Sequence, residues 1–457
     1  MRWRRSRQGF RKRTRQASPA IDGISLKYLH YCKYCLVLIA VLVIAKYSHA
    51  QNNDWRKWPI DASGNGADGV HTGDINRDGL VDVVSGWEQS GEIKLYLNPG
   101  PARVREKAAW GGTKISGGLE IEGIEDAAFA DLDLDGFVET VISSIEGDTK
   151  SLGIHWNVRD ELDDPSSWRA LTLTPDHHRG YMKARAGQID GSGGADIVAG
   201  TKTMDGENAG IYWFKSPEIS EATTINKWQR FFIGEIDVKT VTLVLKDMDL
   251  DNLLDVVYSG RNGVGWFRNP GSRALTENPT GAFWERIVIA QTGSEFTFCD
   301  HNGDGREDII MTTSKHSNMV AKWLRRLDDS GRRWQAYPIT SDVLRAGPES
   351  SKKFVLKGVA CGFVDADPHI DLVFTASGQG RGVFMMSPRG DIRDDQSWNL
   401  VYLTSYADDM KYDNLQLVDI DGDSDLDIVT TEEGEGIFSS GDGVLWFENP
   451  LHTPLGH

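Results

Sequence analysis

The sequence predicts an all-β protein, a seven-bladed β-propeller of four-stranded antiparallel blades. Three features repeat along the chain and predict it: an acidic loop, a strand that begins with tryptophan, and a strand that ends in a proline turn. The acidic loop occurs seven times, at intervals of 53 to 65 residues. Blades of four short strands fit this period, whereas coils of a solenoid are shorter and β-sandwich domains need about 100 residues each.

The acidic loop is clearest in Asp300-His-Asn302-Gly-Asp304-Gly305-Arg-Glu-Asp308. Oxygen-bearing side chains stand at its first, third, fifth and ninth positions, and a glycine stands at the sixth, where a tight turn needs positive φ. Calcium takes roughly six to eight oxygen ligands, which such a curled loop supplies. An EF-hand would need glutamate at the twelfth position and a helix after it, but Met311 stands there and apolar residues surround it. We therefore predict a calcium loop between two strands.

Six other segments follow the same pattern. Four of them match at all four ligand positions: 74–82, 131–139, 247–255 and 419–427. The third of these has Asn252 at the turn, a residue that also tolerates left-handed φ. Two loops are altered, because Gln188–Asp196 has weaker ligands and Asp365–Asp371 lacks two residues from its middle. Five complete loops predict about five calcium ions.

The strands around each loop supply the rest of a blade. A short apolar strand such as Phe296–Cys299 precedes the loop, a β-branched strand follows it, and a third strand ends in a turn such as Trp266-Phe-Arg-Asn-Pro270. Proline cannot donate to a β-ladder and so stops the strand. The fourth strand begins with a tryptophan that recurs once per repeat, and we interpret these residues as packing between blades: Trp55, Trp110, Trp168, Trp228, Trp284, Trp334 and Trp398.

The two ends of the propeller region predict how the ring closes. The region opens with a fourth-strand segment, 54–60, and ends on a third-strand segment, 444–449. The last blade would otherwise lack its outer strand and expose an edge. We therefore expect residues 54–60 to pair with residues 444–449.

Residues 1–50 differ from the rest of the chain. They hold 11 Lys or Arg against one acid, then the apolar run Cys35–Ala45 and the small residues of Ser48-His-Ala50. Eleven apolar residues are too few to span a bilayer, which takes about 20. We interpret residues 1–50 as a signal peptide with a long basic n-region, cut after Ala50, with an uncleaved anchor as the alternative. Residues 51–457 are then one secreted, periplasmic or cell-surface propeller domain with no stable membrane span.

Without residues 1–50 the formal charge moves from −17 to −27. Such a field repels phosphate backbones, so nucleic acid is excluded as a partner. Cys299 and Cys361 remain in the mature chain. Because they stand in different repeats and at different heights on equivalent strands, we expect them not to form a disulfide.

The combination of acidic loops and Trp-Phe-x-Asn-Pro endings resembles the FG-GAP or VCBS-type repeat propellers, which include the integrin alpha-subunit head and secreted bacterial proteins. The resemblance covers residues 54–450. It implies that each loop joins the innermost strand A to strand B and holds one Ca²⁺, and it implies these ligands: Asp74, Asn76, Asp78 and Asp82; Asp131, Asp133, Asp135 and Glu139; Asp247, Asp249, Asp251 and Asp255; Asp300, Asn302, Asp304 and Asp308; Asp419, Asp421, Asp423 and Asp427. It also implies that partners bind the opposite face.

Residues five or six places before each loop stand at the other end of strand A, near the central channel. They are Asp68, Asp126, Lys183, Glu295 and Asp413. Neighbouring loops add further candidates, Trp87, His178, Arg179, Tyr181, Arg261 and His316, of which Trp87 also falls outside the repeated tryptophan pattern. Polar groups around a concave opening predict a binding site. The alternative is a channel mouth that is polar only because water fills it.

The mature sequence contains no nucleophile elbow, phosphate loop, His-x-x-x-His zinc pair or Cys-x-x-Cys. We therefore predict a monomeric binding or scaffold protein for a glycan or an extracellular surface protein. The alternative is a polysaccharide lyase or sugar dehydratase. In that case a cation would neutralise the sugar carboxylate, and His178, Tyr181 or Lys183 on the upper face would take the proton.

Overall fold

The structure is a computed structural model. It describes residues 55–117, 122–147, 150–173, 180–203, 208–224, 227–261, 263–313, 321–340, 355–377, 382–393, 398–404, 410–434 and 441–451. The segment interpreted as a signal peptide lies outside the described residues, and so do three candidate ligand residues, His178, Arg179 and His316.

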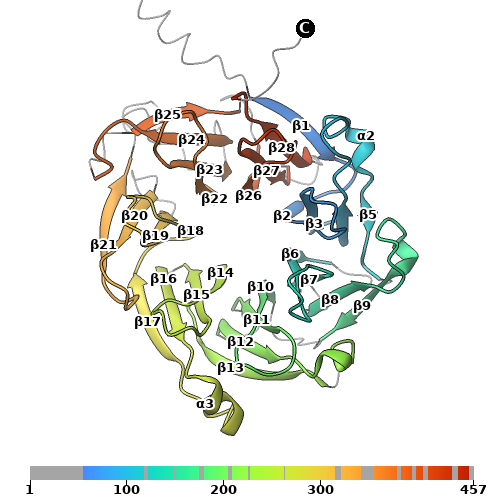
Figure 1. Cartoon of the computed structure of the whole chain (residues 1–457), viewed down its shortest axis with the longest axis vertical. Coiled ribbons are helices and arrows are strands. Elements are labelled where there is room, and N and C mark those ends of the chain that lie inside the picture. The colour runs from blue at the N-terminus through green and yellow to red at the C-terminus, as the bar shows by residue number, and fades with distance from the viewer. Residues whose placement is uncertain are drawn as a thin grey trace, which may run out of the picture. The chain divides into compact units, whose positions relative to one another are not determined.

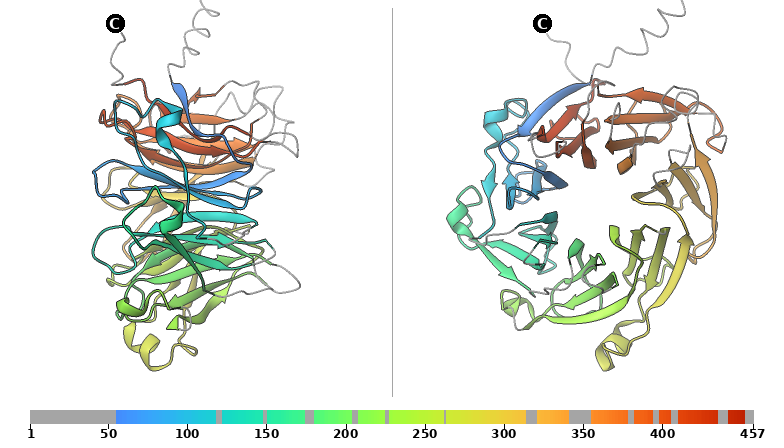
Figure 2. Two further views of the ribbon diagram at one scale, coloured as in Figure 1. Left: turned by 90° about the vertical axis from the view of Figure 1, so that its right-hand side faces the viewer. Right: turned by 180° about the vertical axis from the view of Figure 1, so that it is seen from behind.

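The described strands form seven four-stranded antiparallel sheets, arranged as a ring around one axis (Figure 1). This confirms the predicted seven-bladed propeller. Each innermost strand leads through an acidic loop into the second strand of its blade, as predicted. The view from behind in Figure 2 shows the same ring, with the long outer strands at its rim.

Six blades consist of four consecutive strands, written here from the axis outward. Blade one is β2 (Ala67–Gly73), β3 (Asp82–Trp87), β4 (Glu92–Tyr96) and β5 (Thr113–Lys114). Blade two is β6 (Ile124–Ala130), β7 (Thr140–Ile145), β8 (Leu152–Asn157) and β9 (Trp168–Thr172). Blade three is β10 (Tyr181–Gly187), β11 (Asp196–Thr201), β12 (Gly210–Lys215) and β13 (Gln229–Glu235). Blade four is β14 (Thr240–Lys246), β15 (Asp255–Gly260), β16 (Gly263–Arg268) and β17 (Glu285–Ala290).

Blade five is β18 (Phe296–Cys299), β19 (Asp308–Thr312), β20 (Ala321–Arg326) and β21 (Trp334–Ile339). Blade six is β22 (Val355–Gly362), β23 (Asp371–Ser377), β24 (Val383–Pro388) and β25 (Trp398–Tyr402). Blade seven is β26 (Tyr412–Val418), β27 (Asp427–Glu432), β28 (Gly443–Glu448) and, from the other end of the domain, β1 (Arg56–Asp61).

The seventh blade closes the ring as predicted. β1 pairs antiparallel with β28, with Arg56 opposite Glu448 and Trp58 opposite Trp446. The Trp58 ring stacks on Trp446 with 6.5 Å between ring centroids, and its Nε1 donates to Glu448 at 2.7 Å. Because β1 is the outermost strand of its sheet, Pro59 needs no partner on its outer side.

The hydrophobic core lies between neighbouring blades. One cluster, for example, joins Ile142 and Ile154 of blade two to Ile197 and Tyr212 of blade three. The second strands, such as β3 and β7, are buried along their whole length because blades cover both of their faces. Most of the repeated tryptophans are buried, which agrees with a packing role. The buried ones are Trp110, Trp168, Trp228, Trp284 and Trp398.

Short helices occupy the connections between third and fourth strands. They are α2 (Lys107–Trp110), α3 (Ser272–Glu277), and the 3₁₀ turns η1 (Pro165–Ser167) and η2 (Ile219–Glu221). Trp110 therefore lies in a helix before the very short β5, instead of opening the strand as predicted. Among the described residues, no helix is long and apolar enough to cross a membrane.

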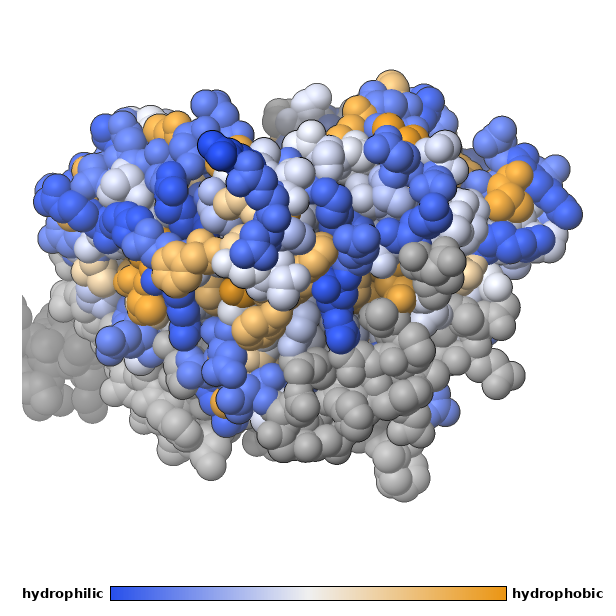
Figure 3. All heavy atoms as spheres, turned by 90° about the horizontal axis from the view of Figure 1, so that it is seen from below, coloured by the Kyte–Doolittle hydropathy of each residue, from blue (hydrophilic) through white to orange (hydrophobic). Residues whose placement is uncertain are grey.

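The rim of the ring exposes separate hydrophobic side chains. Phe232 on β13 is 49% exposed and Val288 on β17 is 53% exposed. Figure 3 views the ring from the side on which these two strands lie in Figure 1, and it shows hydrophobic patches interrupted by hydrophilic residues. Scattered apolar residues of this kind are normal on a soluble surface.

Candidate functional site

The innermost strands have two ends, and candidate residues gather at both. We call the end that carries the acidic loops the loop end. We call the opposite end, with Asp68, Asp126, Lys183, Glu295, Lys357 and Asp413, the channel mouth.

At the loop end, the first aspartate of each complete loop organises the turn. In blade two the Asp131 carboxylate accepts the backbone N–H groups of Asp135 and Gly136 at 3.2 and 2.9 Å. Gly136 has φ of 92°, in the region where a side chain would be strained. The corresponding pair of bonds is accepted by Asp74, Asp247, Asp300 and Asp419. In the blade-four loop the turn residue is Asn252, with φ of 65° as expected.

The ninth loop residue ties the loop to the third strand. Asp82 accepts the Ile75 N–H on one oxygen at 3.0 Å and the Asn98 N–H on the other at 2.8 Å. The same pair of bonds is made by Asp196, Asp255 and Asp427. Burial raises the pKa of Asp82 to about 6, although both N–H donors act in the opposite direction. The ninth residue is therefore a buried brace, whatever further role it has as a ligand.

The blade-two loop fits a calcium ion best. Carboxylate oxygens of Asp131, Asp133, Asp135 and Glu139 all lie within 4.8 Å of one another. One Glu139 oxygen accepts the Leu132 N–H at 2.9 Å, but the other is buried without a hydrogen-bond partner. Burial, and then the neighbouring aspartates, raise the pKa of Glu139 to about 7. A hard divalent cation would satisfy the unpartnered oxygen and offset the repulsion between the carboxylates.

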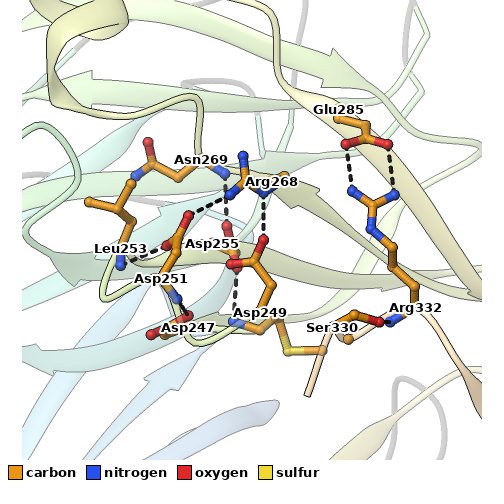
Figure 4. A network of polar contacts seen from close by, with 12 residues as sticks. Asp247, Asp249, Asp251, Leu253, Asp255, Arg268, Asn269, Glu285, Ser330 and Arg332 are labelled. Atoms are coloured by element: carbon orange, nitrogen blue, oxygen red, sulfur yellow. Dashed lines mark hydrogen bonds and ion pairs between the residues drawn. The ribbon is translucent and has the colours of Figure 1, made fainter. Parts of the chain in front are cut away.

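The blade-four loop also fits, although an arginine enters it (Figure 4). Asp247, Asp249 and Asp251 form a cluster within 4.8 Å. The Arg268 guanidinium donates to Asp249 at 2.5 Å and to Asp251 at 2.6 Å. The second Asp249 oxygen is nevertheless buried without a partner. A metal ion could therefore still be accommodated on the side away from Arg268.

The blade-seven loop is similar. Asp419, Asp421 and Asp427 form a cluster within 4.8 Å. Arg105 of blade one bridges Asp421 and Glu448, and the other Asp421 oxygen is buried without a partner. This loop, too, retains an oxygen that a cation could use.

The remaining two complete loops have an amide at the third position. The Asn76 amide donates to Asp78 at 2.9 Å in blade one, and the Asn302 amide donates to Asp308 at 2.7 Å in blade five. Arg325 also reaches Asp304 of the blade-five loop at 3.0 Å. A metal ion in either loop would take the amide oxygen instead, so these two loops fit less directly.

The two altered loops use the chain's own groups. In blade three Lys215 forms an ion pair with Asp190 and donates to Ser192 Oγ at 3.0 Å. In blade six Ser387 Oγ donates to Asp365 at 3.1 Å. Neither loop is among the described groups of three or more acidic ligands.

The channel mouth gathers charges from different blades around a cavity of about 320 Å³. Asp126 of blade two, 1% exposed, accepts from Arg185 at 2.7 Å and lies 3.6 Å from Lys183, both of blade three. His71 of blade one contacts the same carboxylate at 3.2 Å. Further round the ring, Lys357 donates to Asp413 at 2.7 Å. Of the residues predicted for this end, Asp126, Lys183 and Asp413 thus lie beside oppositely charged partners.

Electrostatic interactions set the charge state of these residues. Burial opposes the charged form of Lys183, but Asp126, Asp68 and Glu295 outweigh it and raise its pKa. Burial likewise fails to neutralise Asp126, whose pKa is held well below its usual value by Lys183 and Arg185. Glu295 is different, because burial raises its pKa to about 7 and Lys183 compensates only in part. Asp68 has a strongly raised pKa through burial and the charge of Asp413.

Sequence reasoning missed three residues of the channel mouth, His71, Arg185 and Lys357. The pairing of the innermost and second strands shifts register near the mouth in six blades, between Ala67 and Val70 in blade one for example. Such bulges re-aim side chains next to functional sites. Of the three, only Lys357 lies within such a shift, whereas His71 and Arg185 were missed because they stand three places before their loops, closer than the count of five or six. The alternation of Lys183 and Arg185 on one strand was a usable signal for Arg185.

Trp87 is not a surface ligand contact, which corrects the prediction. It ends β3 instead of lying in a loop, and it is fully buried. Its Nε1 donates to Tyr96 Oη at 3.0 Å, and its ring packs so tightly against Gly443 of blade seven that an added Cβ would lie 2.7 Å away. The reason for the error is that ring closure brings blades one and seven together, which places Trp87 in their shared core.

Tyr181 is also buried and is therefore misplaced in the predicted mouth. Its ring meets Phe214 edge-on at 6.1 Å, and its Oη accepts from Arg230 at 3.3 Å. The bulge between Tyr181 and Lys183 turns the lysine to the channel and leaves the tyrosine in the core. Arg261 lies exposed in the turn between β15 and β16.

The expectation of two free cysteines is wrong, because Cys299 and Cys361 form a disulfide with 6.5 Å between their Cα atoms. They lie on β18 and β22, the innermost strands of blades five and six. Neighbouring blades come closest together at the axis. A difference in height along equivalent strands is therefore not enough to separate two side chains there.

The described residues provide little for the lyase interpretation. Tyr181 is buried, and the raised pKa of Lys183 keeps it protonated, so neither can readily accept a proton. Ser143 and His155 do lie 2.9 Å apart, but both are fully buried and the imidazole also contacts the Ile115 carbonyl at 3.1 Å. Such a pair is a satisfied core contact.

Comparison with a family model agrees with this architecture. A family model for FG-GAP-like repeats matches residues 74–142 and 247–311, which run from the loop of blade one into β7 and from the loop of blade four into β19. No curated protein matches the chain. A similar solved structure is an Agrocybe aegerita lectin that recognises non-reducing terminal N-acetylglucosamine, with 12% identity, a TM-score of 0.43, and 75% of this chain and 81% of that chain covered.

Two further solved structures show comparable similarity. BBS1N in complex with ARL6DN has 12% identity and a TM-score of 0.47, with 87% of this chain and 97% of that chain covered. The S. cerevisiae core factor has 10% identity and a TM-score of 0.48, with 87% of this chain and 62% of that chain covered.

Proposed function

This chain is a seven-bladed β-propeller with FG-GAP-like repeats, and we propose that it is a secreted, calcium-binding module whose channel mouth binds a glycan or an extracellular surface protein. The fold is that of a binding or scaffold module. The ligand, the metal and the compartment are each proposed from a different observation.

The channel mouth carries the proposal of a ligand site. Lys183 and Arg185 line a cavity and both pair with buried Asp126, in a place where apolar residues would seal the core at lower cost. Because most of these charges are already paired, a strongly charged ligand would have to break ion pairs to bind. A ligand rich in hydroxyl and amide groups, such as a glycan or a protein loop, can instead add hydrogen bonds to the paired groups.

The loop end supports the proposal of calcium. The blade-two loop supplies four carboxylates and an unpartnered oxygen, and the loops of blades four and seven supply three carboxylates each. Calcium bound there would neutralise these carboxylates and fix the turns, with no direct part in ligand binding. The loops of blades one and five are proposed as weaker sites.

The disulfide supports the proposal of secretion. Disulfides persist in oxidising compartments and are rare in the cytosol. The Cys299–Cys361 pair therefore favours an extracellular or periplasmic location, in line with the signal peptide proposed for residues 1–50.

The test is a glycan and surface-protein array probed with the purified mature chain, with and without calcium. Lys357→Met removes a cation at the channel mouth, and Arg306→Ala removes one at the loop end, where Arg306 donates to exposed Asp329. We expect Lys357→Met to weaken binding at least tenfold and Arg306→Ala to leave it unchanged, with both variants folded. The reverse pattern would move the ligand site to the loop end, and equal binding by both variants would remove it from the channel mouth.

A further inference from the structure

The residue at the end of the third strand, or just after it, lies opposite the ninth residue of the acidic loop of its own blade. In blade three, Ile197 pairs with Phe214, so the next residue, Lys215, lies opposite the ninth loop residue. The pairing of Val83 with Tyr96 gives Leu97 the same place in blade one. The pairing of Val256 with Phe267 gives it to Arg268 in blade four. The blades therefore differ at one equivalent position in whether they present a cation to the loop.

Lys215 reaches two of the four loop positions where a metal ion would take ligands. Its ammonium forms an ion pair with Asp190, the third loop residue, and donates to the Oγ of Ser192, the fifth, at 3.0 Å. The Asp190 side chain is fully buried, and Lys215 is 26% exposed. Lys215 thus lies at the solvent side of a buried carboxylate and neutralises it.

The other loop residues leave little for a divalent ion. The Gln188 amide replaces the first aspartate, and its nitrogen donates to the carbonyls of Ser192 and Gly194 at 3.2 and 3.0 Å. Asp196 makes the same two backbone bonds as the ninth residue of the complete loops, so the loss of acids at the first and fifth places is what sets this loop apart. Asp190 is then the one carboxylate of this loop that faces a cation, and its single charge matches an ammonium better than Ca²⁺.

We infer that the Lys215 ammonium is the resident cation of the third loop and replaces calcium there, so that this blade is stable without metal. The blade-four loop has a basic residue at the same place but keeps its acidic residues. Arg268 also enters that loop, yet three aspartates surround it and one Asp249 oxygen stays unpartnered. In blade three, by contrast, both Asp190 oxygens have partners, Ser192 on one and Lys215 on the other, so a basic side chain excludes the metal when it completes the partners of the loop carboxylate.

The inference is independent of any ligand at the channel mouth, and it is tested by counting calcium. The full mature chain is dialysed against calcium, and bound metal per chain is measured by atomic emission. Gln188→Asp with Ser192→Asp restores the ligands of a complete loop but keeps Lys215. Adding Lys215→Leu, the residue of blade one at that place, also removes the ammonium.

We expect the double variant to bind the same number of calcium ions as the natural chain, and the triple variant to bind one more. An additional ion in the double variant would overturn the inference, because Lys215 would then not keep the metal out. An unchanged count in the folded triple variant would overturn it as well, because the loop would then reject calcium for another reason.

Thermal unfolding supplies a second measurement that does not depend on the triple variant folding. Lys215→Leu alone leaves buried Asp190 without its cation and should lower the Tm in calcium and in chelator alike, whereas Lys215→Arg should restore most of the loss. If calcium returned the Lys215→Leu variant to the natural Tm, a metal rather than the lysine would be the natural occupant.

Discussion

The loop end and the channel mouth are opposite ends of the same seven strands, yet they follow different rules. At the loop end the same bonds recur from blade to blade: the first aspartate holds the turn and the ninth residue braces the third strand. At the channel mouth, equivalent places hold residues of opposite charge, such as Asp126 and Lys183, and they pair across blades. Features shared by all blades belong to the fold, whereas features that differ between blades are candidates for function.

Because all blades share the four-stranded arrangement, we expect the largest loss of stability when one blade loses one of its strands. Deleting residues 55–61 removes β1, the fourth strand of blade seven, and exposes β28 as an unpaired edge. We expect the variant to aggregate, because the contacts of Trp58 with Trp446 and Glu448 are lost and the edge can pair with other chains. Size-exclusion chromatography and circular dichroism measure the result.

A point substitution on the same strand is the control. Lys57 contacts Asp442 at 2.5 Å, but both side chains are well exposed, and exposed ion pairs contribute about 0–1 kcal/mol. Lys57→Ala should therefore behave like the natural chain. If the chain without β1 remained a stable monomer, ring closure would not be what holds the propeller together.

The same division explains how much of the molecule could be predicted from the sequence. The loop frame and the pairing of β1 with β28 were predictable, because each follows from local residues repeated at a regular interval. Trp87, Tyr181 and the Cys299–Cys361 disulfide were misjudged, because their surroundings come from other blades. Strand alternation also fails at the channel mouth, where bulges change the face on which side chains lie.

Removing calcium should give the next largest effect. A ligand bound only by the folded state stabilises it by about 2.7 kcal/mol per site at one hundred times its dissociation constant. Excess chelator should therefore lower the Tm strongly, and Asp133→Asn in the blade-two loop should reduce the bound calcium by one. An unchanged melting curve in chelator would show that the carboxylate clusters of blades two, four and seven are not metal sites.

The disulfide occurs in one pair of blades only, as a functional feature would, yet it has no evident ligand role. It links the innermost strands of blades five and six across a sequence separation of 62 residues. Changing Cys299 and Cys361 together to Ser should cost about 2–4 kcal/mol of stability, the usual range for such a cross-link. Urea unfolding measures the loss, with reduced natural protein as the matched control. Ligand binding should be unchanged in the folded variant.

The smallest effect concerns Glu295, and it tests whether the channel mouth is desolvated or simply filled with water. Burial raises its pKa from 4.5 to about 7, so the folded state holds this proton more tightly than the unfolded state. The contribution of Glu295 to folding stability therefore falls as the pH rises from about 4.5 through 7. A difference of one pKa unit between the folded and unfolded states corresponds to about 1.4 kcal/mol. Gln has nearly the same shape and does not titrate. Glu295→Gln should match the natural chain at pH 5 and exceed its stability by roughly 2–3 kcal/mol at pH 8.

Thr242→Val removes the hydroxyl that donates to Glu295 at 2.5 Å, and should widen the pH dependence by destabilising the ionised form. A stability difference between Glu295→Gln and the natural chain that does not change with pH would show a carboxylate in open water, and the mouth would then be polar through solvation alone.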